Sequence, residues 1–526
     1  MTCANCNDWR ALVLAQLSYP STCNSCDFCQ ELSIIEDQVR DSVAALQSLL
    51  QRHKRKKKQI NHVHSPIMKL PPELLSTVFL LLRPGDVLGH NPSVEDRADA
   101  FQPLLLGAVC TTWRQLAWAT PQLWNRPFFD CSIIQKQDRH PLALEWLSRA
   151  QLVPVTLSIT YVELYSIHPG ARPFLEAIAS TSSQWKTVSA EMTFTLMQYM
   201  FHCVRRWDNI DNLLLYPNEG PYYLPEDQPL FGEAKPSPRS ITIPLYAVTF
   251  DKMNINWCRV QEAKVEPLSE EACIRFLHAH PALESCEFTI IDDSSNSIGT
   301  PISALTHYRL RSLTFDEFSG TSSHLLARLT LPNLDHLSLN KNESFEEDIE
   351  NEVLTFFLQS RPSKLQKLEL VGFNFNLEDM KLLLELLPAV LHLHLPISWS
   401  LIEHDIGSEP EYPLLRHLAA TMDEPGLIAP RLEVIELSLN KYLCIDIQWN
   451  TVAEIVASLY YPVIQVLPHR RPLKTFRFNL EYLHYEPTPS IAKRKIYELT
   501  QAGAEIMVND DLVVVSAIDL EEEEQR

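Results

Sequence analysis

Apolar residues recur along much of the chain at the spacing Leu-x-x-Leu-x-Leu, where x is any residue and other apolar side chains replace some leucines. Five regular copies begin at Leu310, Leu334, Leu365, Val390 and Leu432, and less regular copies begin at Ile210, Leu283, Leu415 and Leu473. From residue 283 the starts are 27, 24, 31, 25, 25, 17 and 41 residues apart. Because periods of about 20 to 50 residues are typical of repeat proteins, the pattern predicts an array of similar units.

Each copy predicts a short strand with two or three inward-facing apolar residues. The stretches between copies, such as residues 270–278 and 378–387, predict helices packed behind the strands. One unit cannot bury its apolar face alone, whereas stacked units can, so the pattern favours an irregular α/β solenoid whose strands line a concave surface. This array is similar to leucine-rich repeats. A generic α/β domain, in which the motif marks only buried strands, stays open.

Residues 31–51 show helical spacing, because apolar residues alternate in steps of three and four. These residues are Leu32, Ile35, Val39, Leu46 and Leu49, with the polar Ser42 in one slot. The spacing predicts an amphipathic helix, and both a dimeric coiled coil and packing on the following domain remain open. A basic run follows, consisting of Arg52, His53, Lys54, Arg55, Lys56, Lys57 and Lys58. It is either a solvated helix end or a nuclear-import signal.

Two more helices are predicted between residues 65 and 130. The first follows Pro71 and Pro72, whose missing amide hydrogens cost nothing at a helix start. Its broad apolar face comprises Leu74, Leu75, Val78, Phe79 and Leu82. The second, residues 104–117, carries Leu105, Leu106, Val109, Trp113 and Leu116 on one side. The face of the first helix is unusually broad for a short helix, which indicates contact with its own domain and with a partner.

Three blocks in this segment, residues 70–75, 109–117 and 123–124, resemble an F-box. That pattern opens with Leu-Pro-x-Glu-Leu-Leu, continues with Val-Cys-x-x-Trp-Arg-x-Leu-Ala and ends with a Leu-Trp pair. The flanking residues are similar to the expanded F-box families of mushroom-forming fungi. The resemblance implies a small all-α domain that docks on a Skp adaptor. Relative to a minimal F-box, residues 83–103 are an insertion.

The resemblance also implies which residues meet the adaptor. The facing residues would be Leu70, Pro71, Leu74, Leu75, Val78 and Phe79, and the supporting or extending residues would be Val109, Cys110, Trp113 and Leu116. The chain would then be the substrate-recognition subunit of a Skp–cullin–F-box ubiquitin ligase. It would bind a cullin through Skp and hold an unidentified protein substrate on the Leu-rich array. Such a subunit is not an enzyme, because it supplies only proximity.

Five cysteines cluster near the start of the chain. Cys3, Cys6, Cys23 and Cys26 form two Cys-x-x-Cys pairs, and Cys29 lies three residues beyond. Four thiolates can surround one tetrahedral zinc ion, so a structural zinc site and uncoordinated thiols are both open, and no other cofactor is expected. With the basic run, this cluster gives the alternative function, a nuclear regulatory protein that contacts nucleic acid.

The composition and motif content of the chain argue against several classes of function. The formal net charge of −21 argues against broad binding to nucleic acid or to anionic membranes, because like charges repel. The sequence lacks the usual phosphate-binding and zinc-protease motifs, which argues against an enzyme. The most apolar stretch, residues 382–401, includes charged Glu385 and two prolines, so no membrane span is expected. No secretion signal is recognised, and we expect the protein in the cytoplasm, the nucleus or both.

The residues beside the predicted strands share no chemical theme, which favours a protein partner over one small ligand. His392 and His394 alternate as in a strand, so their rings should share one face; a metal-binding pair and two histidines bonded within the protein are the alternatives. The expected organisation is a Cys-rich segment (1–30), a helix with a basic run (31–64), the F-box (65–130), the Leu-rich domain (131–508), and a strand with an acidic tail (509–526).

Overall fold

The structure is a computed structural model that describes residues 27–64, 66–82, 101–130, 140–161, 171–218, 229–244, 250–266, 270–289, 304–318, 323–341, 350–373, 375–397, 413–424, 428–439, 449–460, 470–479, 490–508 and 511–512. It divides into two compact units, Met1–Leu82 and Arg83–Arg526, which we call the N-terminal and C-terminal units. Each unit is described by itself. The boundary at Leu82 falls inside the segment that resembles an F-box.

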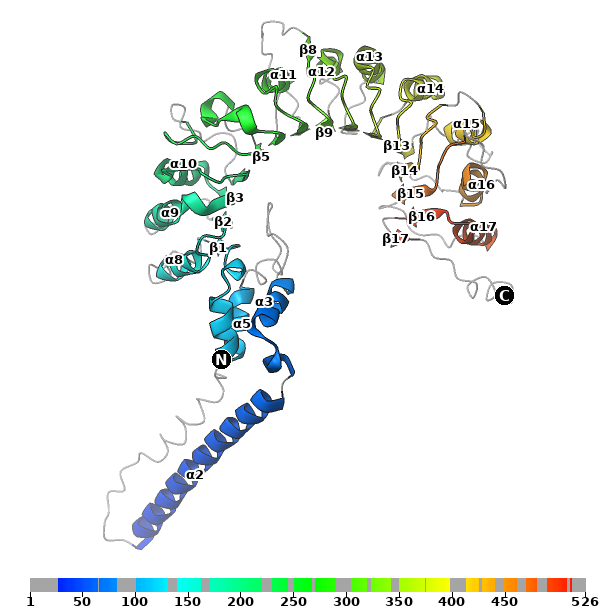
Figure 1. Ribbon diagram of the computed structural model, residues 1–526. Helices are drawn as coiled ribbons and strands as arrows, with labels where there is room; N and C mark the ends of the chain where they lie inside the picture. The colour runs from blue at the N-terminus through cyan, green and yellow to red at the C-terminus, as the bar shows by residue number, and fades with distance from the viewer. Residues whose placement is uncertain are drawn as a thin grey trace. The chain divides into compact units, whose positions relative to one another are not determined.

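The N-terminal unit contains helix α2 (Asp27–His64), the 3-10 turn η1 (Pro66–Lys69) and helix α3 (Pro72–Leu81). Helix α2 has 38 residues and extends the predicted amphipathic helix through the whole basic run (Figure 1). Lysine and arginine are good helix formers, which explains why the helix does not end at residue 51. Pro71 precedes α3 and Pro72 is its first residue, as expected for prolines at a helix start.

The C-terminal unit is a mixed α/β fold built on one long sheet. Fifteen strands form this sheet in chain order, and their neighbours are parallel except for the last pair, β16 and β17. They are β1 (Phe128–Asp130), β2 (Val155–Thr160), β3 (Trp185–Met192), β4 (Asn212–Pro217), β5 (Ser240–Pro244), β6 (Glu262–Glu266), β7 (Ser285–Thr289), β9 (Ser312–Phe318), β11 (His336–Lys341), β12 (Lys367–Val371), β13 (His392–Ile397), β14 (Val434–Leu439), β15 (Thr475–Asn479), β16 (Glu505–Val508) and β17 (Asp511–Leu512). A second, two-stranded sheet pairs β8 (Leu305–Thr306) with β10 (Leu329–Thr330).

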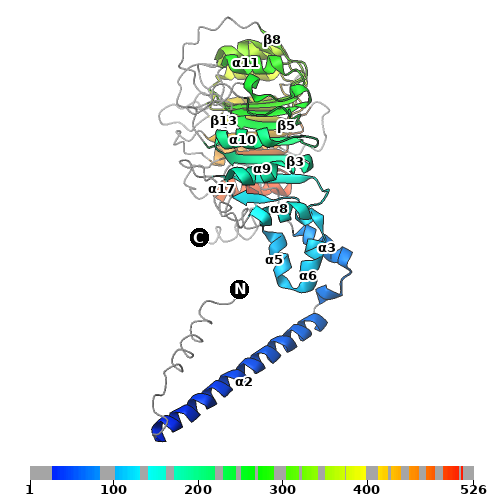
Figure 2. The same ribbon diagram turned by 90° about the vertical axis from the view of Figure 1, so that its left-hand side faces the viewer.

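Helices alternate with the strands of the C-terminal unit. They are α5 (Gln102–Val109), α6 (Thr111–Trp118), α8 (His140–Arg149), α9 (Ala171–Ala179), α10 (Phe194–Cys203), α11 (Glu270–Ala279), α12 (Ser323–Ala327), α13 (Glu350–Ser360), α14 (Leu377–Glu385), α15 (Pro413–Ala420), α16 (Trp449–Tyr460) and α17 (Ser490–Gln501), with 3-10 turns η2 (Pro121–Leu123), η4 (Ser182–Gln184), η6 (Phe250–Met253) and η7 (Trp257–Arg259). From α8 onward the helices lie outside the curved sheet, whose strands line the inner side (Figure 1). Figure 2 shows the strands stacked across this unit.

Stacked leucines form the core between the sheet and these helices. Leu337 on β11 lies in register with Leu313 on β9 and Leu368 on β12, and all three are completely buried. Two residues later Leu339 lies in register with Phe315 and Leu370, which are also buried, so each of these motifs supplies two apolar residues from one face of its strand. A fully buried leucine stabilises a fold by roughly 1.5–3 kcal/mol. Because the buried column is continuous, each repeat is stabilised by packing against its neighbours.

A repeated pair of hydrogen bonds fixes the start of the strands from β5 to β15 in the long sheet. The carbonyl oxygen of Glu284 accepts from the amides of Arg311 (2.8 Å) and Ser312 (3.0 Å). The carbonyl of Arg311 accepts from Asp335 (2.7 Å) and His336 (2.9 Å) in the same way. The carbonyls of Asp335, Gln366, Leu391 and Glu433 continue the series. Because the pair recurs across unequal spacings, strand register does not depend on the length of the intervening segment.

Two features differ from the sequence-based expectation. Residues 104–117 form two helices rather than one, because Cys110 adopts an extended conformation (φ −159°, ψ 173°) between α5 and α6. The expected strand motif at Leu415 lies in helix α15 instead, where Leu414, Leu415 and Leu418 are buried at helical spacing. The other eight motif copies each contain a strand that starts two residues after the first apolar residue.

Candidate functional site

The first block of the F-box resemblance lies on η1 and α3 in the N-terminal unit. Leu70, Pro71 and Leu74 are exposed, and the exposed fraction of Leu74 is 54%. Val78 is half-buried, whereas Leu75 and Phe79 are buried. Sequence reasoning assigned all six residues to the contact. The structure divides them into a small exposed apolar surface and an inner pair that supports it.

The second block lies on α5 and α6 in the C-terminal unit. The backbone turns at Cys110, whose sulfur accepts from the amide of Trp113 at 3.4 Å and caps α6. Arg114 Nε donates to the carbonyl of Gly107 at 2.8 Å and ties the two helices together. Val109 is exposed, while Cys110, Trp113 and Leu116 are half-buried. Val109 is therefore the most accessible of the four residues that the resemblance assigned to this block.

The residues assigned to the adaptor from the sequence leave out part of the apolar surface on α5 and α6, the helices that carry the second block. Leu104, Leu105 and Trp118 are exposed, and the exposed fraction of Leu105 is 63%. Leu106, the neighbour of Leu105, is buried. Helical spacing in the sequence placed Leu105 and Leu106 on one broad face. In the structure the helix breaks at Cys110, and the buried Leu106 and the exposed Leu105 lie on different sides of α5. The signal was present as an excess of apolar residues for a helix of eight residues.

Two tryptophans anchor the second block to the remainder of the C-terminal unit. Trp124 Nε1 donates to the Ala117 carbonyl at 2.7 Å, and Trp146 Nε1 on α8 donates to the Trp124 carbonyl at 3.1 Å. The Arg149 guanidinium lies over the rings of Trp118 and Trp124, 4.2 and 4.6 Å from their centroids. The Leu-Trp pair of the third block therefore connects α6 to the remainder of the C-terminal unit.

The inner face of the sheet carries a cluster of titratable side chains. The His392 and His394 rings share one face of β13, as their spacing predicts, and both lie beside Glu436 on β14. His392 Nε2 is 3.1 Å and His394 Nδ1 is 3.9 Å from this carboxylate. On the preceding strands, Glu369 lies 2.5 Å from Lys367 Nζ and 3.6 Å from His336 Nε2. The cluster therefore alternates donors and acceptors across strands β11 to β14.

These pairings shift the protonation of the cluster. Hydrogen bonding from His392 lowers the pKa of Glu436. Burial alone would raise the pKa of Glu369, but donors on His336, Lys367 and Ser338 outweigh it and hold this pKa well below its usual range. Burial also lowers the pKa of His394, although Glu436 opposes that effect. The face thus presents ionised carboxylates between imidazole rings, which suits polar contacts with a protein surface.

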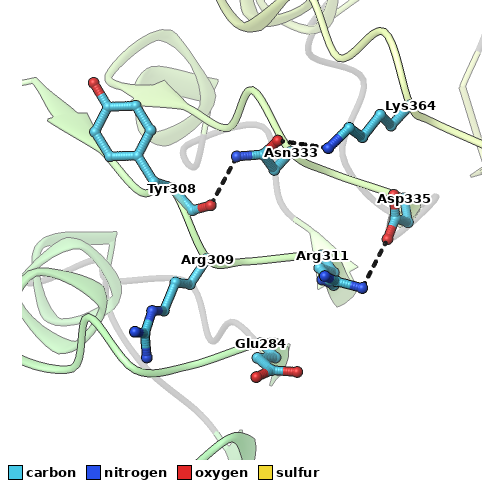
Figure 3. Close-up of a pocket in the computed structure, with 7 residues that line it drawn as sticks. All are labelled: Glu284, Tyr308, Arg309, Arg311, Asn333, Asp335 and Lys364. Atoms are coloured by element: carbon cyan, nitrogen blue, oxygen red, sulfur yellow. Dashed lines mark hydrogen bonds and ion pairs between the residues drawn. The ribbon is translucent and has the colours of Figure 1, made fainter.

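A pocket of about 420 Å³ lies at the strand starts, on the rim of the same sheet (Figure 3). Its lining residues are Glu284, Tyr308, Arg309, Arg311, Asn333, Asp335 and Lys364. Asn333 Nδ2 donates to the Tyr308 carbonyl at 2.9 Å, and Asn333 Oδ1 accepts from Lys364 Nζ at 3.2 Å. Arg311 is 3.9 Å from Asp335. Three cations face two carboxylates, so the pocket can accept an acidic side chain of a partner.

The remaining sequence-based sites have different outcomes. Cys3, Cys6, Cys23 and Cys26 lie outside the described residues. Within the described part, no group of three or more His, Cys, Asp or Glu side chains could hold a metal ion. Arg52, Lys54, Arg55, Lys56 and Lys57 are exposed on α2, and the Lys58 side chain is not described. A search of the described helices finds none that is both long and apolar enough to cross a bilayer.

Comparisons with known proteins add no identification. No model of a protein family matches the chain, and no curated protein is significantly similar to it. The likeness of residues 70–124 to an F-box therefore rests on their own pattern and on the properties of the helices that carry them.

Proposed function

We propose that the chain is the substrate-recognition subunit of a Skp–cullin–F-box ubiquitin ligase. In this account the helices that carry the F-box pattern, α3 and the pair α5 and α6, each dock on the Skp adaptor, and a leucine-rich-repeat-like solenoid holds the substrate. One observation carries the proposal: the helices that carry the first two blocks of the F-box pattern expose large apolar side chains, Leu74 on α3 and Leu105 and Val109 on α5. Exposed apolar clusters of this kind mark surfaces that a partner covers.

The inner sheet face supports the second half of the proposal. Among the described helices of the C-terminal unit, those from α8 onward lie on the outer side of the sheet, which leaves the His–Glu cluster of β11 to β14 facing away from them (Figure 1). Polar side chains on a rigid sheet can select a partner by charge pattern without having to order flexible loops. The rim pocket adds a place for an acidic substrate side chain.

Catalysis in this account belongs to other subunits. The chain would bring a substrate lysine close to an activated ubiquitin, and the rate gain would come from proximity. The mixed charges of the inner face favour a folded protein or peptide as substrate rather than one small molecule, because they are spread over several strands.

Binding to a purified fungal Skp adaptor tests the proposal. Leu105→Asp should weaken adaptor binding at least tenfold, because it buries a charge in an apolar interface. Leu142→Asp on α8 is the matched control, since Leu142 has the same exposed fraction, 63%, but lies outside α3, α5 and α6, the helices that carry the blocks. Leu74→Asp should reproduce the loss on the other block. Equal binding by all three variants, or no binding by the wild-type chain, would refute the proposal.

A further inference from the structure

A row of exposed cations lies along the edge of the long sheet where its strands begin. Before each of four strands, a cation directly precedes the completely buried apolar residue that stands two positions before the strand. These cations, which we call the rim cations, are Arg259 before β6, Arg309 before β9, Lys364 before β12 and Arg431 before β14. All four are exposed. Because a buried neighbour fixes each backbone position, they occupy equivalent places along the rim.

The rim cations recur at every second strand of the sheet. From β6 the sheet continues with β7, β9, β11, β12, β13 and β14, so one strand separates each cation from the next. The equivalent positions before β7, β11 and β13 hold the uncharged residues Ala282, Asn333 and Ala389. Neighbouring strands lie about 4.8 Å apart, so the backbone positions of successive rim cations are separated by about 10 Å. This regular row contrasts with the formal net charge of −21 for the whole chain.

The charges of the rim cations are only partly neutralised within the protein. Arg259 Nη2 lies 3.9 Å from the Asp211 carboxylate, and both side chains are exposed. Lys364 Nζ donates to an uncharged group, Asn333 Oδ1. Within the part of the chain that the structure describes, the side chains of Arg309 and Arg431 make no ion pair. A single exposed ion pair adds little to affinity, so a partner must meet several of these cations at once.

The pocket of Figure 3 lies between two rim cations and indicates which anion fits. Lys364 lines it from one side, and Arg309 lines the opposite side (Figure 3). The pocket holds three cations and two carboxylates, so its formal charge is +1. One carboxylate of a partner balances this charge, whereas a phosphate group, with a charge of about −2, would exceed it. The Tyr308 ring is 69% exposed and offers an apolar contact beside the carboxylate.

We propose that the rim cations bind an extended acidic segment of a protein, in which carboxylates recur at every third residue. In a polyproline II helix three residues complete one turn and span about 9.3 Å, so side chains three residues apart point the same way. This span matches the interval of about 10 Å between the rim cations. In a β-strand, side chains three residues apart lie on opposite faces and could not follow the row. Naming the segment a ligase substrate rests on the proposed function, whereas the binding itself does not.

A continuous polyanion fits this rim less well than an acidic segment. Carboxylates stand immediately before four strands of the same sheet, namely Asp211 before β4, Glu284 before β7, Asp335 before β11 and Glu433 before β14. They would repel the closely spaced phosphates of a nucleic acid, and the net charge of the chain adds to this repulsion. Carboxylates at every third residue leave room for these acidic positions.

Fluorescence anisotropy of a labelled peptide with the full chain, in the absence of adaptor, tests the inference. The probe is a peptide of four Glu-Pro-Ser repeats, in which proline favours the polyproline II conformation. The control peptide has the same composition, but its four glutamates are contiguous. We expect the repeat peptide to bind roughly tenfold more tightly, because only its carboxylates can meet several rim cations at once. No binding of the repeat peptide, or equal binding of the two peptides, would overturn the proposal.

Two further probes test the kind of anion. A repeat peptide with phosphoserine in place of glutamate should bind no more tightly than the glutamate peptide, and clearly tighter binding would overturn the assignment to carboxylates. Oligouridylate should bind more weakly than the glutamate peptide. Tighter binding of oligouridylate would indicate a nucleic-acid surface and would also overturn the proposal.

Charge reversal locates the site on the rim. Arg309→Glu/Lys364→Glu should weaken binding of the repeat peptide roughly tenfold, because two attractions become repulsions. Arg309→Gln/Lys364→Gln should weaken it less and gives a milder test of folding. The matched control, Arg52→Glu/Lys54→Glu, makes the same change of charge on exposed residues of α2. Peptide binding that is lost in the α2 variant but kept in the rim variant would refute the site. Adaptor binding should be equal in all variants, so failure of this inference is distinguishable from failure of the proposed function.

Discussion

The His280 ring stacks on the Trp257 ring, with centroids 4.2 Å apart and ring planes 23° apart. Phe276 packs edge-on against the same imidazole, and His280 is buried at the end of α11. Burial between aromatic rings disfavours the charged imidazolium and lowers the pKa of His280 from 6.5 to about 4. The folded protein therefore holds this histidine neutral at pH values where the unfolded chain protonates it.

This histidine makes stability depend on pH. Between pH 6.5 and about 4 the unfolded state binds a proton that the folded state does not, so stability is full above this window and falls as the pH drops through it. At about pH 5 we expect a loss of roughly 1–2 kcal/mol from this group. His280→Phe, which keeps the stacking, should flatten the dependence in urea unfolding measured at neutral pH and near pH 5.

The exposed His278 on the same helix supplies the control. His278→Phe should leave the slope of stability against pH unchanged. The pKa of His307 is also lowered by burial, but this residue is present in both variants and cancels in the comparison. A wild-type slope retained in His280→Phe would show that the stacked ring is not responsible.

Gly372, just after β12, allows two neighbouring strand ends to approach closely. Its φ is +79°, and a Cβ atom there would lie 2.6 Å from the Lys341 carbonyl oxygen. Gly372→Ala should destabilise the protein by roughly 1–3 kcal/mol, because both the backbone conformation and the contact become unfavourable. Gly107→Ala, inside α5, meets nothing closer than 3.7 Å and should be neutral or stabilising. Thermal unfolding midpoints compare the two, and equal midpoints would contradict this reading of Gly372.

Arg471 joins the last turn of α15 to the segment before β14. Its guanidinium donates to the carbonyls of Leu418 (2.6 Å) and Ile428 (2.8 and 2.9 Å), and burial lowers its pKa to about 10. Arg471→Met should cost roughly 3–5 kcal/mol, because it leaves these carbonyls without their charged donor. Arg470→Met removes a more exposed ion pair with Asp423 and should cost at most about 1 kcal/mol. Urea midpoints that rank in the opposite order would contradict this account of Arg471.

The sequence predicted a strand most clearly where the motif contains both a spacing of three residues and a spacing of two residues. In Leu310-x-x-Leu313-x-Phe315 the last two residues stand two apart, which only a strand puts on one face, and β9 begins at Ser312 as expected. The copy at Leu415 lacks that signal, because its third position is the exposed Ala420, and the remaining spacing of three suits a helix equally well. Such a copy could not be distinguished without knowing which residues are buried.

Several strands were not predicted from the sequence, because smaller apolar residues replace the leucines of the motif. Strand β6 follows Val260, and its inward residues are Ala263 and Val265. Strand β3 uses Val188 and Ala190 in the same places. A search for leucine misses these copies, although the spacing is retained. The candidate adaptor site shows a similar limit of the sequence. Spacing predicted the helices that carry the F-box pattern, but it did not predict that Leu75 and Phe79 are buried while Leu105 is exposed.

Amide hydrogen exchange of the full chain, with and without a purified fungal Skp adaptor, tests the central proposal most directly. When the adaptor is present, we expect slower exchange on η1 and α3 and on α5 and α6. Exchange on β11 to β14, which the proposal assigns to substrate binding, should not change. Protection confined to the sheet, or no protection at all, would contradict the assignment of these helices to adaptor binding.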